Sequence, residues 1–331
     1  MRKKRLGVIG TFVWDVIHGR DPREAPVEEW GGITYALGAL DAALSNDWEL
    51  VPLVKVGDDL APQAYEFLRT LRRVAIDARP IVVPWRNNRV ELFYESAERR
   101  SEVLSGGVPG WSWLGLAPLV HDLDALYVNL ISGFELDLPT AQLLRQRFRG
   151  PIYCDLHSLV LAVQASGLRT PRPLADVGAW CRCADLLQVN EDELAMMAPD
   201  PMGLAATALA AGVSTLIVTL GARGIVYFAA PGVERLTDVG AQRAHANTFG
   251  ADAQGGTIRT QLVPAHVAQV VDGGDPTGCG DVWGATYFAR MLAGDIMSEA
   301  MHAALHAAAR NVEHRGATGL AHYLRRELSP T

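Results

Sequence analysis

Hydrophobic and polar positions alternate regularly through the second half of the chain, where short apolar runs are followed by longer segments with helical spacing. Short runs of this kind indicate buried strands, and the longer segments indicate helices that cover them. The expected strands are 125–129, 151–155, 186–190 and 215–220, and the expected helices are 138–148, 174–183, 192–197 and 202–211. Strand and helix in alternation predict an α/β fold with a doubly wound, mainly parallel sheet.

The two ends of the chain extend this pattern. At the N-terminal end we expect strands at 5–10, 11–17, 49–56 and 82–84, and helices at 33–44 and 62–73. Towards the C-terminus we expect a β meander at 224–229 and 232–237, a loop at 238–261, and helices at 282–293, 298–313 and 321–328. We find no internal repeat, so residues 1–331 are interpreted as one domain.

One segment has a different periodicity. Between Arg89 and Leu104, apolar Val90, Leu92 and Tyr94 alternate with polar or exposed positions, which predicts a hairpin with one solvent-facing side. We interpret two segments, about 11–30 and 86–106, as a small β lid. A two-stranded hairpin is marginal alone in water, so its apolar face needs a cover from the main domain, from 11–30 or from a second subunit.

The composition is that of an ordinary globular protein, with 331 residues, 49% hydrophobic and 20% charged. A net charge of -7 argues against nucleic acid or an anionic membrane as the main partner. The four cysteines lack disulfide-like spacing and favour a reducing cytoplasm. We expect no signal peptide and no membrane helix, because every apolar run is too short.

The most informative stretch is Asp275-Pro-Thr-Gly-Cys-Gly-Asp281, which leads into a helix. Amides in the first turn of a helix have no partner within it and attract anions, and Gly278 and Gly280 let the backbone approach an anion closely. A phosphate loop would need Lys after its last Gly, where Cys279 stands. Alone, the stretch favours a plain helix N-terminus with Asp281 complementing the helix dipole.

The stretch resembles the D-T-x-G-A-G-D signature of the ribokinase-like sugar kinases, also called the phosphofructokinase-B family, with Pro276 and Cys279 as mild departures. The resemblance implies that Asp281 is the catalytic base. It also implies that the amides of Gly278, Cys279, Gly280 and Asp281 form an anion hole. Motifs along nearly the whole chain follow the family order, including the Lys55-Val-Gly-Asp-Asp59 turn.

An acid after the first strand, Asp15, is followed by the pair Gly31-Gly32. A carboxylate can accept two hydroxyl hydrogen bonds, although a lone Asp here is also typical of a turn. In the ribokinase-like family an Asp and a Gly-Gly pair in this order hold the substrate. The family usually has Asn where this chain has Val13 and Ala36, so two polar substrate contacts are missing and the acceptor cannot be named.

The nucleotide and metal motifs are weaker individually. Asn190 to Glu193 resembles the family's N-x-x-E motif, which positions Mg²⁺ largely through water, and it is also a capping-box pattern. Thr219, Gly221 and Gly224 resemble the nucleotide-phosphate turn, and Asn311 lies where relatives border the adenine. The Asp that matches Asp275 helps many relatives to bind a monovalent cation such as K⁺. A loop-bracing hydrogen bond is the equal alternative.

A zinc site is the competing interpretation of Cys154, His157, Cys181 and Cys183, but their spacing matches no known finger. His302 and His306 share a helical face without a third ligand nearby in the sequence.

The resemblance implies an ATP- and Mg²⁺-dependent kinase for a primary hydroxyl of a sugar or sugar-like molecule. The alternatives are a nucleoside kinase, with Phe12, Trp14 or Trp30 stacking on the base, and a non-catalytic sensor. A sensor would have no use for the acid at 281. Because relatives often pair their lids, we also expect a homodimer that forms through the hairpin.

Overall fold

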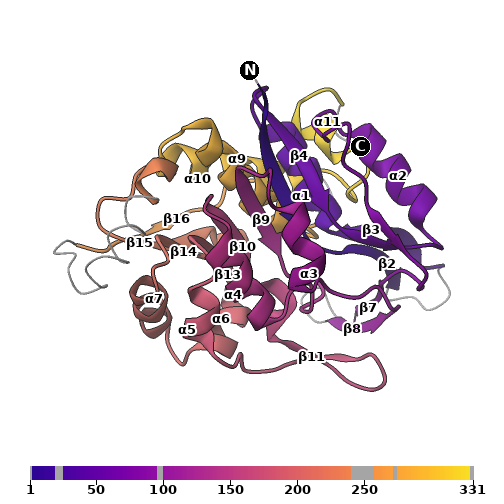
Figure 1. The fold of residues 1–331 in the computed structure, drawn as a ribbon. Coiled ribbons are helices and arrows are strands. Elements are labelled where there is room, and N and C mark those ends of the chain that lie inside the picture. The colour runs from indigo at the N-terminus through magenta and orange to yellow at the C-terminus, as the bar shows by residue number, and fades with distance from the viewer. Residues whose placement is uncertain (1, 19–24, 95–99, 240–256, 271–273, 329–331) are drawn as a thin grey trace.

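The structure is a computed structural model that describes residues 2–18, 25–94, 100–239, 257–270 and 274–328. An eight-stranded sheet runs through the middle of the molecule (Figure 1), in the order β16-β15-β14-β13-β10-β9-β1-β4. Its strands are β1 (Lys4–Ile9), β4 (Trp48–Leu53), β9 (Ala125–Asn129), β10 (Ile152–Asp155), β13 (Leu186–Asn190), β14 (Thr215–Thr219), β15 (Ile225–Ala229) and β16 (Arg259–Val263). All neighbouring strands from β14 to β4 are parallel, whereas β15 is antiparallel to both of its neighbours, β14 and β16. This is the expected α/β architecture.

Helices cover both faces of this sheet. One face carries α1 (Ile33–Ala43), α2 (Ala61–Thr70), α9 (Cys279–Ala293), α10 (Met297–Val312) and α11 (Leu320–Leu324). The other carries α3 (Trp113–Leu116), α4 (Leu138–Arg147), α5 (Val177–Cys181), α6 (Glu191–Met197) and α7 (Pro201–Ala210). Each face has its own hydrophobic core, because side chains of one strand alternate between the faces: Leu6 and Val8 pack on one side and Ile9 on the other.

A second sheet of four strands, in the order β3-β2-β7-β8, lies at one end of the molecule (Figure 1). Its strands are β2 (Phe12–His18), β3 (Val27–Gly32), β7 (Arg89–Tyr94) and β8 (Arg100–Ser105). The two segments expected to form the lid therefore pair with each other, with β2 and β7 parallel. Residues 19–24 and 95–99 of those segments lie outside the described residues.

The apolar face of the hairpin is covered within the same chain. Val90 and Leu92 are buried and form a small core with Val13 and Ile131. The side chain of Tyr94, the third expected member of this face, lies outside the described residues. The sequence left three possible covers for this face: the main domain, the 11–30 segment and a second subunit. In the structure the main domain and the 11–30 segment cover it.

Two expectations about the region after β15 are wrong. The second strand of the meander is β16, not 232–237, where a turn leads into helical residues 236–239. The Asp238 carboxylate accepts hydrogen bonds from the backbone amides of Glu234 and Arg235 at 2.9 and 2.7 Å. These amides are then not available for hydrogen bonds to a neighbouring strand. The strand β16 also lies partly inside the expected loop 238–261, of which residues 240–256 are outside the described part.

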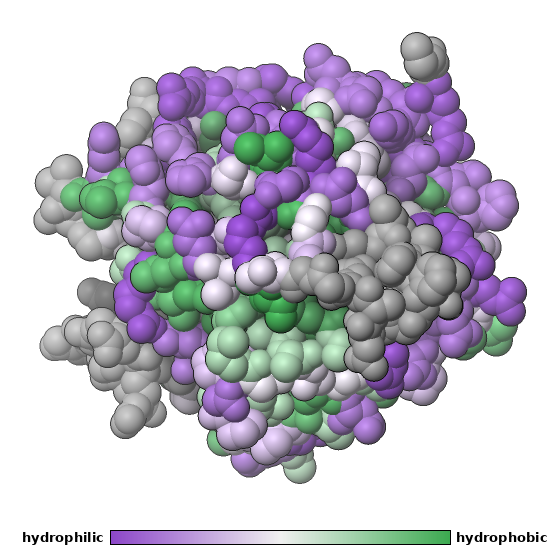
Figure 2. Space-filling view, turned by 90° about the vertical axis from the view of Figure 1, so that its left-hand side faces the viewer, coloured by the Kyte–Doolittle hydropathy of each residue, from purple (hydrophilic) through white to green (hydrophobic). Residues whose placement is uncertain are grey.

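Short elements complete the chain. Strands β5 (Lys55–Gly57) and β6 (Ile81–Val83) form a parallel pair, and β11 (Leu161–Val163) and β12 (Arg169–Pro171) form a hairpin that the sequence did not reveal. Three 3-10 turns lie at Ala117–Leu119, His157–Val160 and Gly221–Arg223. No helix in the described part of the chain is both long and apolar enough to cross a membrane. On the face beside β15 and β16, hydrophobic residues gather near the centre, below a band of mainly hydrophilic ones (Figure 2).

Candidate active site

The motif residues meet at the carboxyl edge of the large sheet. Asn129, Asp155 and Asn190 are the last residues of β9, β10 and β13, and Thr219 ends β14. In doubly wound sheets ligands bind outside this edge, at the point where the strand order reverses. Here the order reverses at β1, which has β4 as its neighbour on one side and β9 on the other. Asp281, at the start of α9, faces the same edge, because its carboxylate contacts Asn129.

Asp281 is a buried acid in the first turn of α9. Burial raises the pKa of its carboxyl group to about 7, although a hydrogen bond from Asn129 acts in the opposite direction. The Asn129 side-chain amide donates to Asp281 Oδ1 at 2.5 Å. A carboxylate with a pKa near neutral pH is suited to accept a proton from a hydroxyl group.

The loop before α9 has the geometry of an anion site. Gly278 has φ of 74°, a conformation that favours glycine, and a Cβ there would lie 2.3 Å from the Tyr35 ring. The Cys279 amide donates to the Pro276 carbonyl at 3.2 Å, so it is engaged within the loop. Of the four amides expected in the anion hole, those of Gly278, Gly280 and Asp281 donate to no other residue in the described part of the chain.

The Cys279 side chain points towards α10. Its Sγ lies 3.5 Å from the Ala308 carbonyl and accepts the Asn311 amide at 3.4 Å. Burial raises the pKa of this thiol to about 11, so it stays protonated at neutral pH. Cys279 is thus a packing residue of the loop, which explains why it can stand where the family usually has Ala.

Asn311, expected from the sequence to border the nucleotide, contacts this loop. Its side chain is fully buried, and its amide donates to the Thr277 carbonyl at 2.7 Å. The Thr277 amide in turn donates to Asp275 Oδ1 at 2.9 Å. Of the two roles considered for Asp275, the observed contact is the loop-bracing one.

A set of polar residues beneath the loop was not found from the sequence. The Gln188 side-chain amide donates to Asp155 Oδ2 at 2.8 Å and to the Gly280 carbonyl at 3.1 Å, and the Tyr153 hydroxyl donates to Gln188 Oε1. Gln188 therefore fixes the loop to the floor of the site. The available signals were a polar residue within an apolar strand, for Gln188, and a polar residue at the end of one, for Asn129 and Asp155.

Two more carboxylates lie near Asp281. Burial, followed by the charges of Glu193 and Asp281, raises the pKa of Asp155 well above its usual range. Burial also raises the pKa of Glu193, and the Asp281 charge adds to this effect. Both Glu193 oxygens accept hydrogen bonds from Asn190, in the capping box that the sequence predicted at the start of α6. These acids disfavour one another's ionised forms, so a cation among them would stabilise the site.

The acceptor motif is assembled on the small sheet. Asp15 is buried on β2, and a Cβ on Gly31 would lie 1.8 Å from Asp15 Oδ2. Gly31 is therefore needed for the Asp15 carboxylate to take its place. Gly32, the N-cap of α1, has φ of 60°, and a Cβ there would meet the Thr11 carbonyl at 2.8 Å. The two departures from the family pattern, Val13 and Ala36, are both core residues.

Thr219, Gly221 and Gly224 form the turn between β14 and β15, as expected. Gly221 and Gly224 have φ of 56° and 101°. A Cβ on Gly224 would lie 2.1 Å from the Val263 carbonyl, so this glycine lets β16 approach the turn. A Cβ on Gly221 would meet no atom within 4 Å, so packing does not explain Gly221, although its backbone conformation does.

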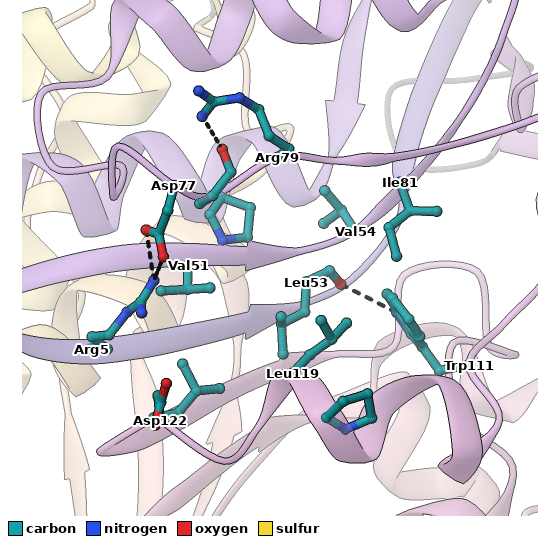
Figure 3. A pocket seen from close by; sticks show the side chains of 14 residues that line it. Arg5, Val51, Leu53, Val54, Asp77, Arg79, Ile81, Trp111, Leu119 and Asp122 are labelled. Atoms are coloured by element: carbon teal, nitrogen blue, oxygen red, sulfur yellow. Dashed lines mark hydrogen bonds and ion pairs between the residues drawn. The ribbon is translucent and has the colours of Figure 1, made fainter.

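A hollow at the edge strand β4 is unrelated to these residues. It has a volume of about 270 Å³ and lies between β4, the segment around Arg79 and the region of Trp111 and Leu119 (Figure 3). Its polar groups already have partners: Arg5 pairs with Asp77 at 2.8 Å and the Trp111 indole donates to the Leu53 carbonyl at 3.2 Å. We therefore place the candidate active site at the sheet edge and not in this hollow.

Comparisons with known proteins identify the family and the fold. A family model described as pfkB family carbohydrate kinase matches residues 53–322. Among solved structures, a nucleoside kinase from Burkholderia thailandensis in complex with inosine is similar, with a TM-score of 0.68, 17% identity and coverage of 96% of this chain and 94% of that one. Ribokinase from Arabidopsis thaliana complexed with ribose and ATP has a TM-score of 0.67, 17% identity and coverage of 99% and 100%.

A third similar structure is a putative ribokinase II from E. coli in complex with ATP and Mg²⁺, with a TM-score of 0.67, 15% identity and coverage of 98% and 99%. The search of curated protein sequences found no match. At these identities the solved structures establish the fold, and the family model establishes the family.

Proposed function

Because the chain belongs to the pfkB family of carbohydrate kinases, we propose that it transfers a phosphoryl group from ATP to a primary hydroxyl of a sugar or sugar-like small molecule. The observation that carries this proposal is Asp281. It is a buried carboxylate at the start of α9, with a pKa raised to about 7, beside a glycine loop that can hold an anion. This combination suits proton removal next to a phosphate.

In the proposed reaction Asp281 accepts the proton of the acceptor hydroxyl. The hydroxyl oxygen forms a bond to the γ-phosphorus of ATP, and the bond from that phosphorus to the bridging oxygen breaks, so that ADP leaves. The amides of Gly278, Gly280 and Asp281, at the positive end of the α9 dipole, stabilise the charge on the transferred group. Positioning and electrostatics of this kind supply most of the catalysis in phosphoryl transfer.

Glu193 and Asp155 would hold Mg²⁺, which neutralises phosphate charge when it is bound. The described part of the chain has no ready cluster of three or more metal-ligating side chains. Mg²⁺ keeps several waters and is bound through few carboxylates together with substrate phosphates. We assign Asp275 to bracing the loop through the Thr277 amide, so a monovalent cation is not part of the proposal.

The nucleotide would lie along the carboxyl ends of β13 and β14. Thr219, Gly221 and Gly224 shape the turn there, and Asn190 positions Glu193. Asn311 acts one step away, since its amide orients the loop that carries the anion site. The small sheet would act as a lid that excludes water, which could otherwise accept the phosphoryl group.

The acceptor would bind between Asp15 and Asp281. A nucleoside acceptor has less support than a sugar, because the aromatic residues considered for base stacking face the other side of the small sheet. Trp14 and Trp30 are opposite each other in the register, on the face away from Asp15, with ring centroids 5.0 Å apart. Phe12 is fully buried against Trp30 and Phe67.

A screen of sugars, polyols and nucleosides with ATP and Mg²⁺, read as ADP release, tests the proposal. We expect at least one sugar-like acceptor to be phosphorylated and Asp281→Asn to abolish the signal. Nucleosides phosphorylated in preference to every sugar would replace the acceptor assignment. ATP or sugar binding without any transfer would favour a sensor instead.

A further inference from the structure

We propose that a hollow among α1, α9, α10 and α11 is a second anion site, for a small molecule that carries a phosphate or carboxylate group. The hollow has a volume of about 220 Å³. It is lined by residues of all four elements, among them Thr286, His306, Arg310 and Arg326, and by none of the residues that we assign to the reaction. The inference does not depend on the proposed kinase function.

Alanines create the space. Ala39 on α1 and Ala303 and Ala307 on α10 lie on its walls, and their short side chains leave the gap between the helices open. The volume is below the roughly 300–1,000 Å³ of pockets for drug-sized molecules. It corresponds to roughly seven water molecules in liquid volume, so it suits a ligand smaller than a nucleotide.

Thr286 is a buried polar residue of the wall. It lines the hollow and is only 5% exposed, and no described residue forms a hydrogen bond with its hydroxyl. A threonine inside a helix can bond to the carbonyl four residues earlier, but Thr286 does not. Because the hydroxyl itself has almost no accessible surface, the side chain would have to rotate to reach a molecule in the hollow, and the proposal rests on the arginines of the wall.

The charges on the walls select an anion. Arg310, Arg326 and His306 line the hollow, and no acidic residue does. The His266 ring lies 5.0 Å from His306 and adds to the basic group. Burial lowers the pKa of His306, and the charges of His266, Arg326 and Arg310 lower it further, so the two arginines and not the histidine supply the positive charge at neutral pH.

Nearby carboxylates are already engaged. Glu313 accepts the Tyr323 hydroxyl at 2.7 Å and the Gln269 amide at 2.8 Å. Glu327 pairs with Arg72 at 2.7 Å and with Arg325 at 3.2 Å. Within the described part of the chain, neither Arg326 nor His306 contacts an acidic side chain. An anion bound in the hollow would therefore be the first negative charge to pair with Arg326.

The Arg326 backbone supports a use for its side chain. Just beyond α11, Arg326 has φ of 62°, a left-handed conformation that glycine adopts at much lower cost. An arginine adopts this conformation at a cost that a glycine would not incur. Arg326 lines the hollow, and its guanidinium could form paired hydrogen bonds with a phosphate or carboxylate that entered it.

The hollow is linked to the active site through two helices. Thr286 is on α9, which begins at the anion loop, and Arg310 directly precedes Asn311, whose amide holds Thr277. An anion that held the Arg310 side chain in place would therefore affect the anion loop through the neighbouring residue Asn311. We expect occupancy of this second site to alter the apparent affinity for the phosphoryl donor.

Equilibrium dialysis with radiolabelled inorganic phosphate tests the site. Wild type should bind phosphate at a class of site that Arg326→Gln weakens about tenfold or more, because a charge-assisted pair is lost. Ala303→Leu should abolish that class by filling the hollow. Arg79→Gln, an exposed arginine whose guanidinium contacts only backbone carbonyls, is the matched control and should bind as wild type does.

Wild-type phosphate binding that is unchanged in both Arg326→Gln and Ala303→Leu would place every bound phosphate elsewhere and overturn the proposal. Absence of phosphate binding in the wild type would also overturn it. Thermal unfolding of each variant, with and without phosphate, checks folding. If Ala303→Leu does not fold, Arg326→Gln alone decides the result.

Discussion

At the scale of single residues, the proposed base is controlled by a side chain from another element. Asn129 ends β9, and its amide donates to Asp281 Oδ1 at 2.5 Å. This hydrogen bond favours the ionised carboxylate and so counteracts the effect of burial on the pKa of Asp281. Asn129 is thus a positioning residue whose removal should change how activity depends on pH.

We predict that Asn129→Ala moves the acid side of the pH–rate profile to higher pH. Asp281 works as a base only when ionised, so activity falls as the pH drops through its pKa of about 7. A hydrogen bond to a charged group contributes about 1.5–3 kcal/mol, so the limb should move up by about one pH unit or more. The measurement is kcat/KM between pH 5 and 9. An acid limb at the same pH in the variant and in wild type would contradict the effect of Asn129 on the pKa of Asp281.

Asp15 gives a second test at this scale. Asp15→Ala should weaken acceptor binding by about 10- to 100-fold, since a charge-assisted hydrogen bond contributes about 1.5–3 kcal/mol. ATP affinity should stay near the wild-type value, because Asp15 is on the small sheet, away from β13 and β14. Calorimetric titration with each ligand separately measures both. An equal loss for ATP would contradict an acceptor role.

The site residues that could be predicted from sequence belong to local motifs. Asp281 with its glycines, and Asn190 with Glu193, are each contiguous, and the structure places both groups at one sheet edge. Gln188 and Asp155 could not be found this way, because their contact joins two strands that lie far apart in the sequence. Likewise, the burial of Asn311 depends on how α10 packs against the loop, which no local pattern encodes.

At the scale of elements, α9 must lie very close to the sheet to carry the base. Gly284, on its second turn, lies against the polar pair of Tyr153 and Gln188. A Cβ there would come within 2.6 Å of both the Tyr153 hydroxyl and Gln188 Oε1. Gly284 disfavours a helix by its intrinsic propensity, and here it lets α9 approach Tyr153 and Gln188 where a side chain would collide with them.

Gly284→Ala should destabilise the protein by about 1–3 kcal/mol through overpacking and should also lower kcat, because Gln188 holds the Gly280 carbonyl. Gly38→Ala is the matched control, within α1. Its Cβ would have its nearest neighbours at an ordinary 3.7 Å. That variant should gain about 0.5–1 kcal/mol. Denaturant unfolding distinguishes the two, and equal effects of both changes would contradict the packing argument.

The element that sequence patterns missed most clearly is β16. Arg259, Thr260 and Gln261 are polar and largely exposed at the edge of the sheet, so the strand has no apolar alternation. Only pairing with β15 makes it a strand. By contrast, the expected and observed boundaries of β9 and β13 coincide, since both are central strands with continuous apolar runs.

At the scale of the whole molecule, the small sheet is joined to the main domain by a core of its own and by ion pairs. Val90 and Leu92 pack on Val13 and Ile131. Asp59 binds the Asn87 amide at 2.7 Å and Arg89 at 3.0 Å, at the base of β7. The homodimer expected from the sequence stays a prediction, but the apolar hairpin face no longer supports it, because that face is covered within one chain.

Leu92→Asp should therefore lower stability by about 3 kcal/mol or more, through a lost core side chain and a buried charge, without changing the mass in solution. Phe93→Asp is the control from the opposite face. Its ring is 37% exposed and stacks on His18, so the cost should be much smaller. Sedimentation and thermal unfolding measure both quantities. Dissociation of a dimer by Leu92→Asp alone would restore the hairpin as the subunit contact.

The central claim is that Asp281 removes the acceptor proton, and Asp281→Asn tests it most directly. The amide cannot act as a base, so we predict turnover lower by roughly 10²- to 10⁴-fold, with ATP binding retained. The Asp281 carboxyl has a pKa of about 7 in the folded protein and an ordinary value of 3.8 when it is exposed. The folded protein therefore loses stability relative to the unfolded chain as the pH rises from 3.8 to about 7. At pH 8 the variant should therefore be more stable than wild type, by at most about 4 kcal/mol. Turnover within a few-fold of wild type, measured with an acceptor identified in the screen, would contradict the assignment.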